Sequence, residues 1–134
     1  MRVLLTFCLI FPLLAHAKDP VSPQEQTETF LSSIQHGNIS EGYDRLFEGS
    51  QIPSAKPQAI SMLKQQTKGG LPLYGKIIGF EKVKEEKFGN SILRFVYVLK
   101  SETHPTIWEF YFYQPKKSWF LINVKFNDQF DLLK

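Results

Sequence analysis

Few side chains in this sequence have the types and the spacing that enzyme chemistry requires. The histidines are His16, His36 and His104, and no two of them have metal-ligand spacing. We expect His36 at a helix end and His104 in an exposed turn, where neither does chemistry. Ser32-Ser33 lacks the context of a nucleophile, and Gly69-Gly70 lacks the lysine of a phosphate-binding loop. The sequence therefore indicates no catalytic residue, no metal site and no cofactor.

Three aromatic residues are the candidates for a ligand site. Tyr43, Tyr97 and Trp108 each join an apolar ring to a hydrogen-bonding tip that needs a partner when it is buried. Aromatic residues make up 14% of the chain, and most of them are expected to form core. If a cavity exists inside the protein, these three would supply its polar lining, and a small apolar or amphipathic ligand would suit it.

The alternative is a small acid-base enzyme, either an isomerase, a lyase or a hydrolase. Such an enzyme needs a carboxylate or histidine base inside its pocket, with a donor for the developing oxyanion. Strand alternation places Glu109 on the face away from the helices. A register slip of one residue would bring Arg94, Glu109 and Tyr111 inward together, as a plausible acid-base site.

Three helices should position these residues. Ser22-Pro23-Gln24-Glu25 has the pattern of a capped helix start, and the first helix is predicted to run to about His36. The second helix is expected to begin at an Asn38 cap and to be closed by Gly49. After an extended link at Gln51-Ile52-Pro53, a third helix begins near Pro57 and ends at Gly69-Gly70.

From Leu71 onward the apolar period changes from that of a helix to that of a strand. Short turns separate the predicted strands, so neighbouring strands should pair antiparallel. Together with the three helices they predict a two-layer α+β domain. The four strands are expected at about Tyr74 to Glu85, Ser91 to Lys100, Thr106 to Tyr113 and Ser118 to Asn127.

Alternation along these strands predicts one apolar face against the helices and a second, mixed face. The mixed face carries enough aliphatic and aromatic side chains to suggest a homodimer interface. On the last strand, Trp119, Leu121, Asn123 and Lys125 are assigned to this outer face. The residues predicted to face the helices are Leu93, Phe95, Tyr97, Leu99, Trp108, Phe110, Phe112, Phe120, Ile122, Val124 and Phe126.

The N-terminus has the pattern of a secretory signal. Arg2 precedes an apolar run from Val3 to Leu14, and Ala15-His16-Ala17 suits a signal peptidase that cleaves after Ala17. The run is shorter than the roughly 20 residues that cross a bilayer, so no transmembrane segment is expected. We therefore expect a periplasmic or secreted protein of residues 18–134. Its single cysteine, Cys8, would be lost with the signal, which leaves no disulfide.

Charge is unevenly distributed along the chain after the signal. Residues 18–53 carry two basic and six acidic side chains, a net charge of −4, and residues 54–134 carry thirteen basic and seven acidic ones, a net charge of +6. The longest basic run is Lys116-Lys117, which is too short to indicate a nucleic-acid partner. A further hypothesis is a secreted protein that binds host or surface partners through its basic C-terminal half.

The order of helices and strands resembles the nuclear-transport-factor-2-like superfamily, which includes ketosteroid isomerase and polyketide cyclases. The closing run Trp119 to Phe126 is similar to the tryptophan-led last strand of many small secreted members. The resemblance implies a curved sheet that wraps the helices into a cone, with a pocket between them. It transfers no active-site residue to this chain. We therefore favour an exported, non-catalytic binding or assembly domain that holds a small apolar ligand or contacts another envelope protein.

Overall fold

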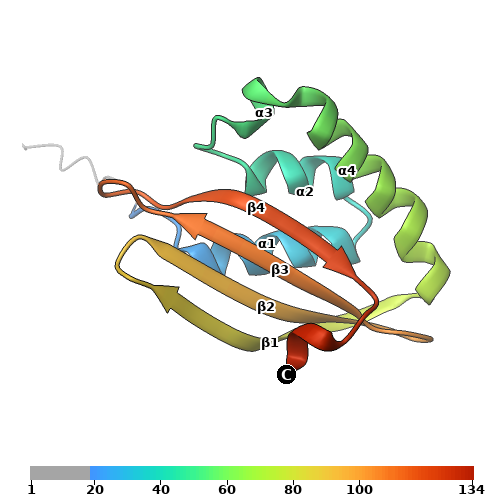
Figure 1. Ribbon diagram of the computed structural model, residues 1–134. Helices are drawn as coiled ribbons and strands as arrows, with labels where there is room; N and C mark the ends of the chain where they lie inside the picture. The colour runs from blue at the N-terminus through green and yellow to red at the C-terminus, as the bar shows by residue number, and fades with distance from the viewer. Residues whose placement is uncertain (1–18) are drawn as a thin grey trace, which may run out of the picture.

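The computed structural model describes residues 19–134, in which the helices come first and the strands follow. The helices lie on one face of an antiparallel sheet, so the architecture is the predicted two-layer α+β fold (Figure 1). The predicted signal, residues 1–17, lies outside the described residues. The elements are α1 (Pro23–Gln35), α2 (Ile39–Leu46), α3 (Ile52–Ala55), α4 (Pro57–Gly70), η1 (Leu71–Tyr74), β1 (Ile77–Phe88), β2 (Ile92–Ser101), β3 (Thr106–Tyr113), β4 (Phe120–Asn127) and η2 (Asp131–Leu133).

The first helix forms as its sequence predicts. Oγ of Ser22 accepts a 3.2 Å hydrogen bond from the backbone N–H of Glu25, and Pro23 occupies the first helical position. The chain leaves α1 through Gly37, whose φ of +80° is costly for a residue with a side chain. The buried stripe of α1 is Thr27, Phe30, Leu31 and Ile34.

Helix α3 corrects the prediction of an extended link at Gln51-Ile52-Pro53. This segment begins a short helix, and the Ser50 hydroxyl accepts a hydrogen bond from the Ile52 backbone N–H at 3.2 Å. Proline is tolerated here because Pro53 lies in the first turn, where its missing N–H would have no helical partner. The described chain therefore has four α-helices where three were predicted.

The sheet has the strand order β1-β2-β3-β4, with every neighbouring pair antiparallel. The bounds predicted for β3 are confirmed at both ends. Strand β1 begins later than predicted, because residues 71–74 form the 3-10 turn η1 and Gly75 follows with a φ of +88°. A Cβ on Gly75 would also lie 3.0 Å from the Thr103 hydroxyl, so this turn requires glycine.

The face of the sheet toward the helices is as predicted in β2 and β3 but not at the start of β4. Leu121 lies opposite Phe112 and is fully buried in the core, whereas Phe120 lies opposite Tyr113 on the other face. The cause is a β-bulge at Ile122, which puts one extra residue into β4 and inverts the alternation before it. The assignments of Phe120 inward and Leu121 outward were therefore wrong.

The outer face of the sheet is partly occupied by the chain after β4. Figure 1 shows η2 on the side of the sheet away from the helices. Nζ of Lys84, which faces outward in β1, donates to the backbone oxygen of Lys134 at 3.0 Å. The rings of Phe130 and His104 lie 5.5 Å apart, so His104 is half-buried rather than fully exposed as expected. Less of this face is open to a second copy than alternation indicated, and the homodimer stays a prediction.

Candidate functional site

The three predicted ligand residues, Tyr43, Tyr97 and Trp108, are all fully buried. Tyr97 and Trp108 lie opposite each other in β2 and β3, and the ring of Phe30 contacts both Trp108 and Tyr43. Each polar tip has a partner inside the protein, and none of the three lines the hollows described below. The partners are Thr67 Oγ1 for the Tyr43 hydroxyl at 2.8 Å, Glu28 Oε1 for the Tyr97 hydroxyl at 3.0 Å, and Thr106 Oγ1 for the Trp108 indole N–H at 3.0 Å.

Burial raises the pKa of both Tyr43 and Tyr97 above the usual value for a phenol. The nearby Glu28 carboxylate raises the pKa of Tyr97 further, because it accepts the hydrogen bond that the neutral phenol donates. Both phenols are therefore uncharged donors that join helices to each other or to the sheet. Their role as a ligand lining stays a prediction. In the structure their hydroxyl groups form hydrogen bonds that join α2 to α4 and β2 to α1.

The residues of the alternative acid-base site do come together, but on the outer face of the sheet. Glu109 is only 1% exposed, and its Oε1 accepts hydrogen bonds from Arg94 Nε at 2.9 Å and Arg94 Nη2 at 2.5 Å. Lys125 Nζ lies 3.2 Å from Oε2, and the Tyr111 hydroxyl lies 3.5 Å from Oε1. Arg94 also binds Glu86 in the neighbouring strand. The cluster forms in the observed register, because Arg94, Glu109 and Tyr111 all lie on the face of β2 and β3 away from the helices.

The charges in this cluster make Glu109 a weak base. Burial alone would raise the pKa of Glu109, but the cations Arg94 and Lys125 outweigh it and hold the pKa below its usual value. A general base needs a pKa near the working pH and a lone pair that can reach the substrate. Here Oε1 already accepts two hydrogen bonds from Arg94. The cluster is therefore typical of a buried structural ion pair.

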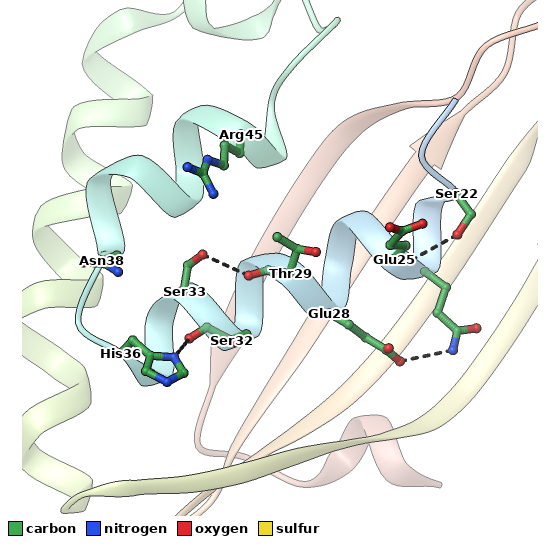
Figure 2. Close-up of a pocket in the computed structure, with 10 residues that line it drawn as sticks. Ser22, Glu25, Glu28, Thr29, Ser32, Ser33, His36, Asn38 and Arg45 are labelled. Atoms are coloured by element: carbon green, nitrogen blue, oxygen red, sulfur yellow. Dashed lines mark hydrogen bonds between the residues drawn. The ribbon is translucent and has the colours of Figure 1, made fainter. Parts of the chain in front are cut away.

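A hollow of about 680 Å³ runs along the exposed face of α1, and we call it hollow 1. Figure 2 shows Arg45 projecting from α2 into the space beside α1. His36, at the end of α1, turns its ring back so that Nδ1 lies 2.7 Å from the backbone oxygen of Ser32. The lining is polar throughout and consists of Ser22, Gln24, Glu25, Glu28, Thr29, Ser32, Ser33, His36, Asn38 and Arg45.

A second hollow, of about 430 Å³, lies where α1 and α2 meet the start of β4, and we call it hollow 2. Its floor is apolar and consists of the half-buried Trp119, of Phe30 and Leu46, which are each only 1% exposed, and of the exposed Pro20 and Val21, beneath a polar rim. The bulge at Ile122 turns Trp119 to the same side of β4 as Leu121. The complete lining is Asp19, Pro20, Val21, Glu25, Gln26, Thr29, Phe30, Ser33, Gly42, Arg45, Leu46, Glu48 and Trp119.

The two hollows share Glu25, Thr29, Ser33 and Arg45, and together we call them the α1–α2 groove. The groove depends on a close approach of its two helices at Gly42, where a Cβ would lie 3.0 Å from the Cβ of Ser33. The helices are also joined by Gln26, whose Nε2 donates to the Leu46 backbone oxygen at 2.7 Å. Both contacts fix the width of the groove.

Sequence reasoning did not find the groove. Its polar residues on α1 have the spacing of an ordinary solvated helix face, and Trp119 was assigned to the outer face of the sheet. The available signal was Trp119, an aromatic residue next to the polar turn before β4. The face of the strand on which its side chain lies depends on the bulge at Ile122. Within residues 19–134, no group of three His, Asp or Glu side chains is arranged to hold a metal ion.

The chain matches no known family model, no curated protein and no solved structure.

Proposed function

We propose that this chain is an exported, non-catalytic binding domain that holds a small ligand with an apolar part in the α1–α2 groove. The observation that carries the proposal is hollow 2, because an apolar floor of aromatic and aliphatic side chains under a rim of a few polar groups is the usual composition of a ligand pocket. Its volume of about 430 Å³ is in the range of small-molecule sites.

The two tryptophans of the chain differ in a way that supports a direct test. Trp119 lines hollow 2 and is half-buried, whereas Trp108 is fully buried and stacks on Phe126 at 4.4 Å. A ligand in the groove should therefore change the fluorescence of Trp119 and leave that of Trp108 unchanged.

The test is a titration with N-phenyl-1-naphthylamine, an uncharged apolar dye whose emission rises on leaving water. The wild-type protein should bind the dye with saturation. Thr29→Trp, which fills the groove from an exposed position that both hollows share, should weaken binding by about tenfold or more, because it occupies the space the ligand needs. Gln35→Trp is the matched control, because Gln35 is exposed on the same helix and does not line the groove. Equal binding by all three proteins would overturn the proposal, as would failure of the wild type to bind both this dye and the octyl probes described in the next subsection.

The alternative, a small acid-base enzyme, receives less support from the same geometry. Its best base, Glu109, is held by Arg94 and lines none of the hollows described above. The export of the chain and its membership of the nuclear-transport-factor-2-like superfamily belong to the proposal as well. The observed order, four helices followed by a four-stranded antiparallel sheet, is compatible with that membership.

A further inference from the structure

The rim of the α1–α2 groove has an excess of negative charge. Four carboxylates line it, and Arg45 is the one Lys or Arg side chain among the described residues that do so. With histidine neutral, the lining has a net charge of −3. The four carboxylates belong to Asp19, Glu25, Glu28 and Glu48.

Among the described residues, most of this charge has no cationic partner. Within residues 19–134, the carboxylates of Asp19, Glu25 and Glu48 form no salt bridge. The hydrogen bonds that Glu28 accepts in this part of the chain come from the neutral groups of Gln24 and Tyr97. Other acidic side chains do have cations, such as Asp44, which lies 2.6 Å from Lys64 Nζ. The surplus therefore faces whatever enters the groove.

The lining holds most of the negative charge of its part of the chain. The side chains of residues 18–53, which contain α1 and α2, have a net charge of −4, of which the lining accounts for −3, and charges of one sign around a cleft raise the local concentration of ions of the opposite sign. The apolar floor formed by Phe30, Leu46 and Trp119 lies directly next to this rim. An occupant that satisfies both features has an apolar body and a positive head.

We propose that the ligand of the α1–α2 groove is a small cationic amphiphile, with an amine or guanidinium head among the carboxylates and an apolar body on the floor. This inference rests on the proposed function and adds the charge of the ligand to it. Arg45 opposes the head with a single positive charge, which the four carboxylates exceed. The negative head of an anionic amphiphile would be repelled by the four carboxylates and attracted by Arg45 alone.

The test compares three probes of equal chain length, namely octylammonium, octanol and octanoate, by the fluorescence of Trp119 at low salt. Octylammonium should bind about tenfold more tightly than octanoate, with octanol between them, and the difference should shrink at 0.5 M salt, where screening shortens to a few ångström. Trp119→Phe should abolish the signal and so confirm its origin.

A double variant that neutralises two carboxylates of the rim tests whether the rim causes the preference. Glu25→Gln with Glu48→Gln should bring the affinity for octylammonium close to that for octanol. Glu41→Gln, an exposed carboxylate of α2 outside the groove, is the control and should leave the preference intact. Circular dichroism of each protein with the highest probe concentration verifies that it stays folded.

The outcomes separate this inference from the proposed function. Equal affinity for the three probes, or a preference for octanoate, would overturn the cationic ligand and leave the groove a binding site. Failure of octanol, octylammonium and the uncharged dye alike to bind would overturn both.

Discussion

The Tyr97 hydroxyl donates a 3.0 Å hydrogen bond to Oε1 of Glu28, which joins the centre of the sheet to the first helix. Tyr97 is fully buried, and its neighbours in the cluster are Phe80, Phe95 and Phe110, with ring centroids 6.0 to 6.2 Å away. Together with the 2.9 Å hydrogen bond from Lys82 Nζ to Gln24 Oε1, this contact fixes α1 over a largely apolar surface, and the same helix carries most of hollow 1.

Tyr97→Phe tests that contact. The substitution keeps the ring and removes a hydrogen bond to a carboxylate, so the free energy of unfolding should fall by about 1 to 2 kcal/mol. Urea unfolding at pH 7 measures it. Tyr113→Phe is the control, because Tyr113 is only half-buried and lies at the end of β3 away from the helices. An equal loss in the two variants would contradict the assigned role.

Glu109→Gln tests the ion cluster on the outer face. It leaves Arg94, which is 9% exposed, with Glu86 as its remaining acidic partner, so the free energy of unfolding at pH 7 should fall by about 3 kcal/mol. Glu102→Gln, at an exposed position in the β2–β3 turn, should have an effect near zero.

The effect of Glu109→Gln should also depend on pH. Because the pKa of Glu109 is lowered in the folded protein, its contribution to stability is fully present above about pH 4.3, the usual pKa of an unfolded glutamate. It is lost as the pH falls through the lower folded pKa. The difference in the free energy of unfolding between wild type and variant should therefore become smaller below pH 4 in urea unfolding. A constant difference from pH 7 to pH 2.5 would refute the lowered pKa.

Gly42→Ala and Gly69→Ala should change stability in opposite directions. Alanine favours a helix by about 1 kcal/mol over glycine, and nothing lies within 4 Å of a Cβ on Gly69, so this variant should gain up to that amount. A Cβ on Gly42 would lie 3.0 Å from the Cβ of Ser33, and separating α1 from α2 should cost about 1 kcal/mol net. Thermal unfolding reports both changes, and a stabilised Gly42→Ala protein would show that the groove can widen freely.

Alanine substitutions at Phe120 and Leu121 test the bulge in β4. Leu121 is fully buried in the core, and its loss should cost about 3 kcal/mol. Phe120 is half-buried on the outer face, where its ring lies 5.7 Å from that of Tyr113, and its loss should cost about 1 kcal/mol. A larger loss for Phe120→Ala than for Leu121→Ala would contradict the bulge and support the uninterrupted alternation that the sequence suggests.

Local signals predicted most of the elements because each depends on a few neighbouring residues. The Ser22 cap, the end of α4 at Gly70 and both bounds of β3 follow from the chemistry of single positions. Helix α3 was missed because proline suits both an extended link and a first helical turn, so Pro53 does not distinguish the two.

The candidate site could not be predicted in the same way, since it depends on how elements meet. Alternation contains no information on a bulge, so Trp119 and Leu121 were assigned to the wrong face. The groove also needs the contact between α1 and α2 at Gly42, which no spacing along the chain reveals. The residues chosen from the sequence, Tyr43, Tyr97 and Trp108, are fully buried and line neither hollow of the groove.

The register shifts of this sheet lie in its two edge strands, which affects whether the protein aggregates at high concentration. The central pair β2 and β3 keeps a regular register, whereas β1 is interrupted near Ile78 and Val83 and β4 near Ile122. Long, flat, unpaired strands recruit further chains into fibrils, and interruptions combined with lysines weaken that templating. The protein should therefore resist amyloid-like stacking even though its β-strands are rich in phenylalanine.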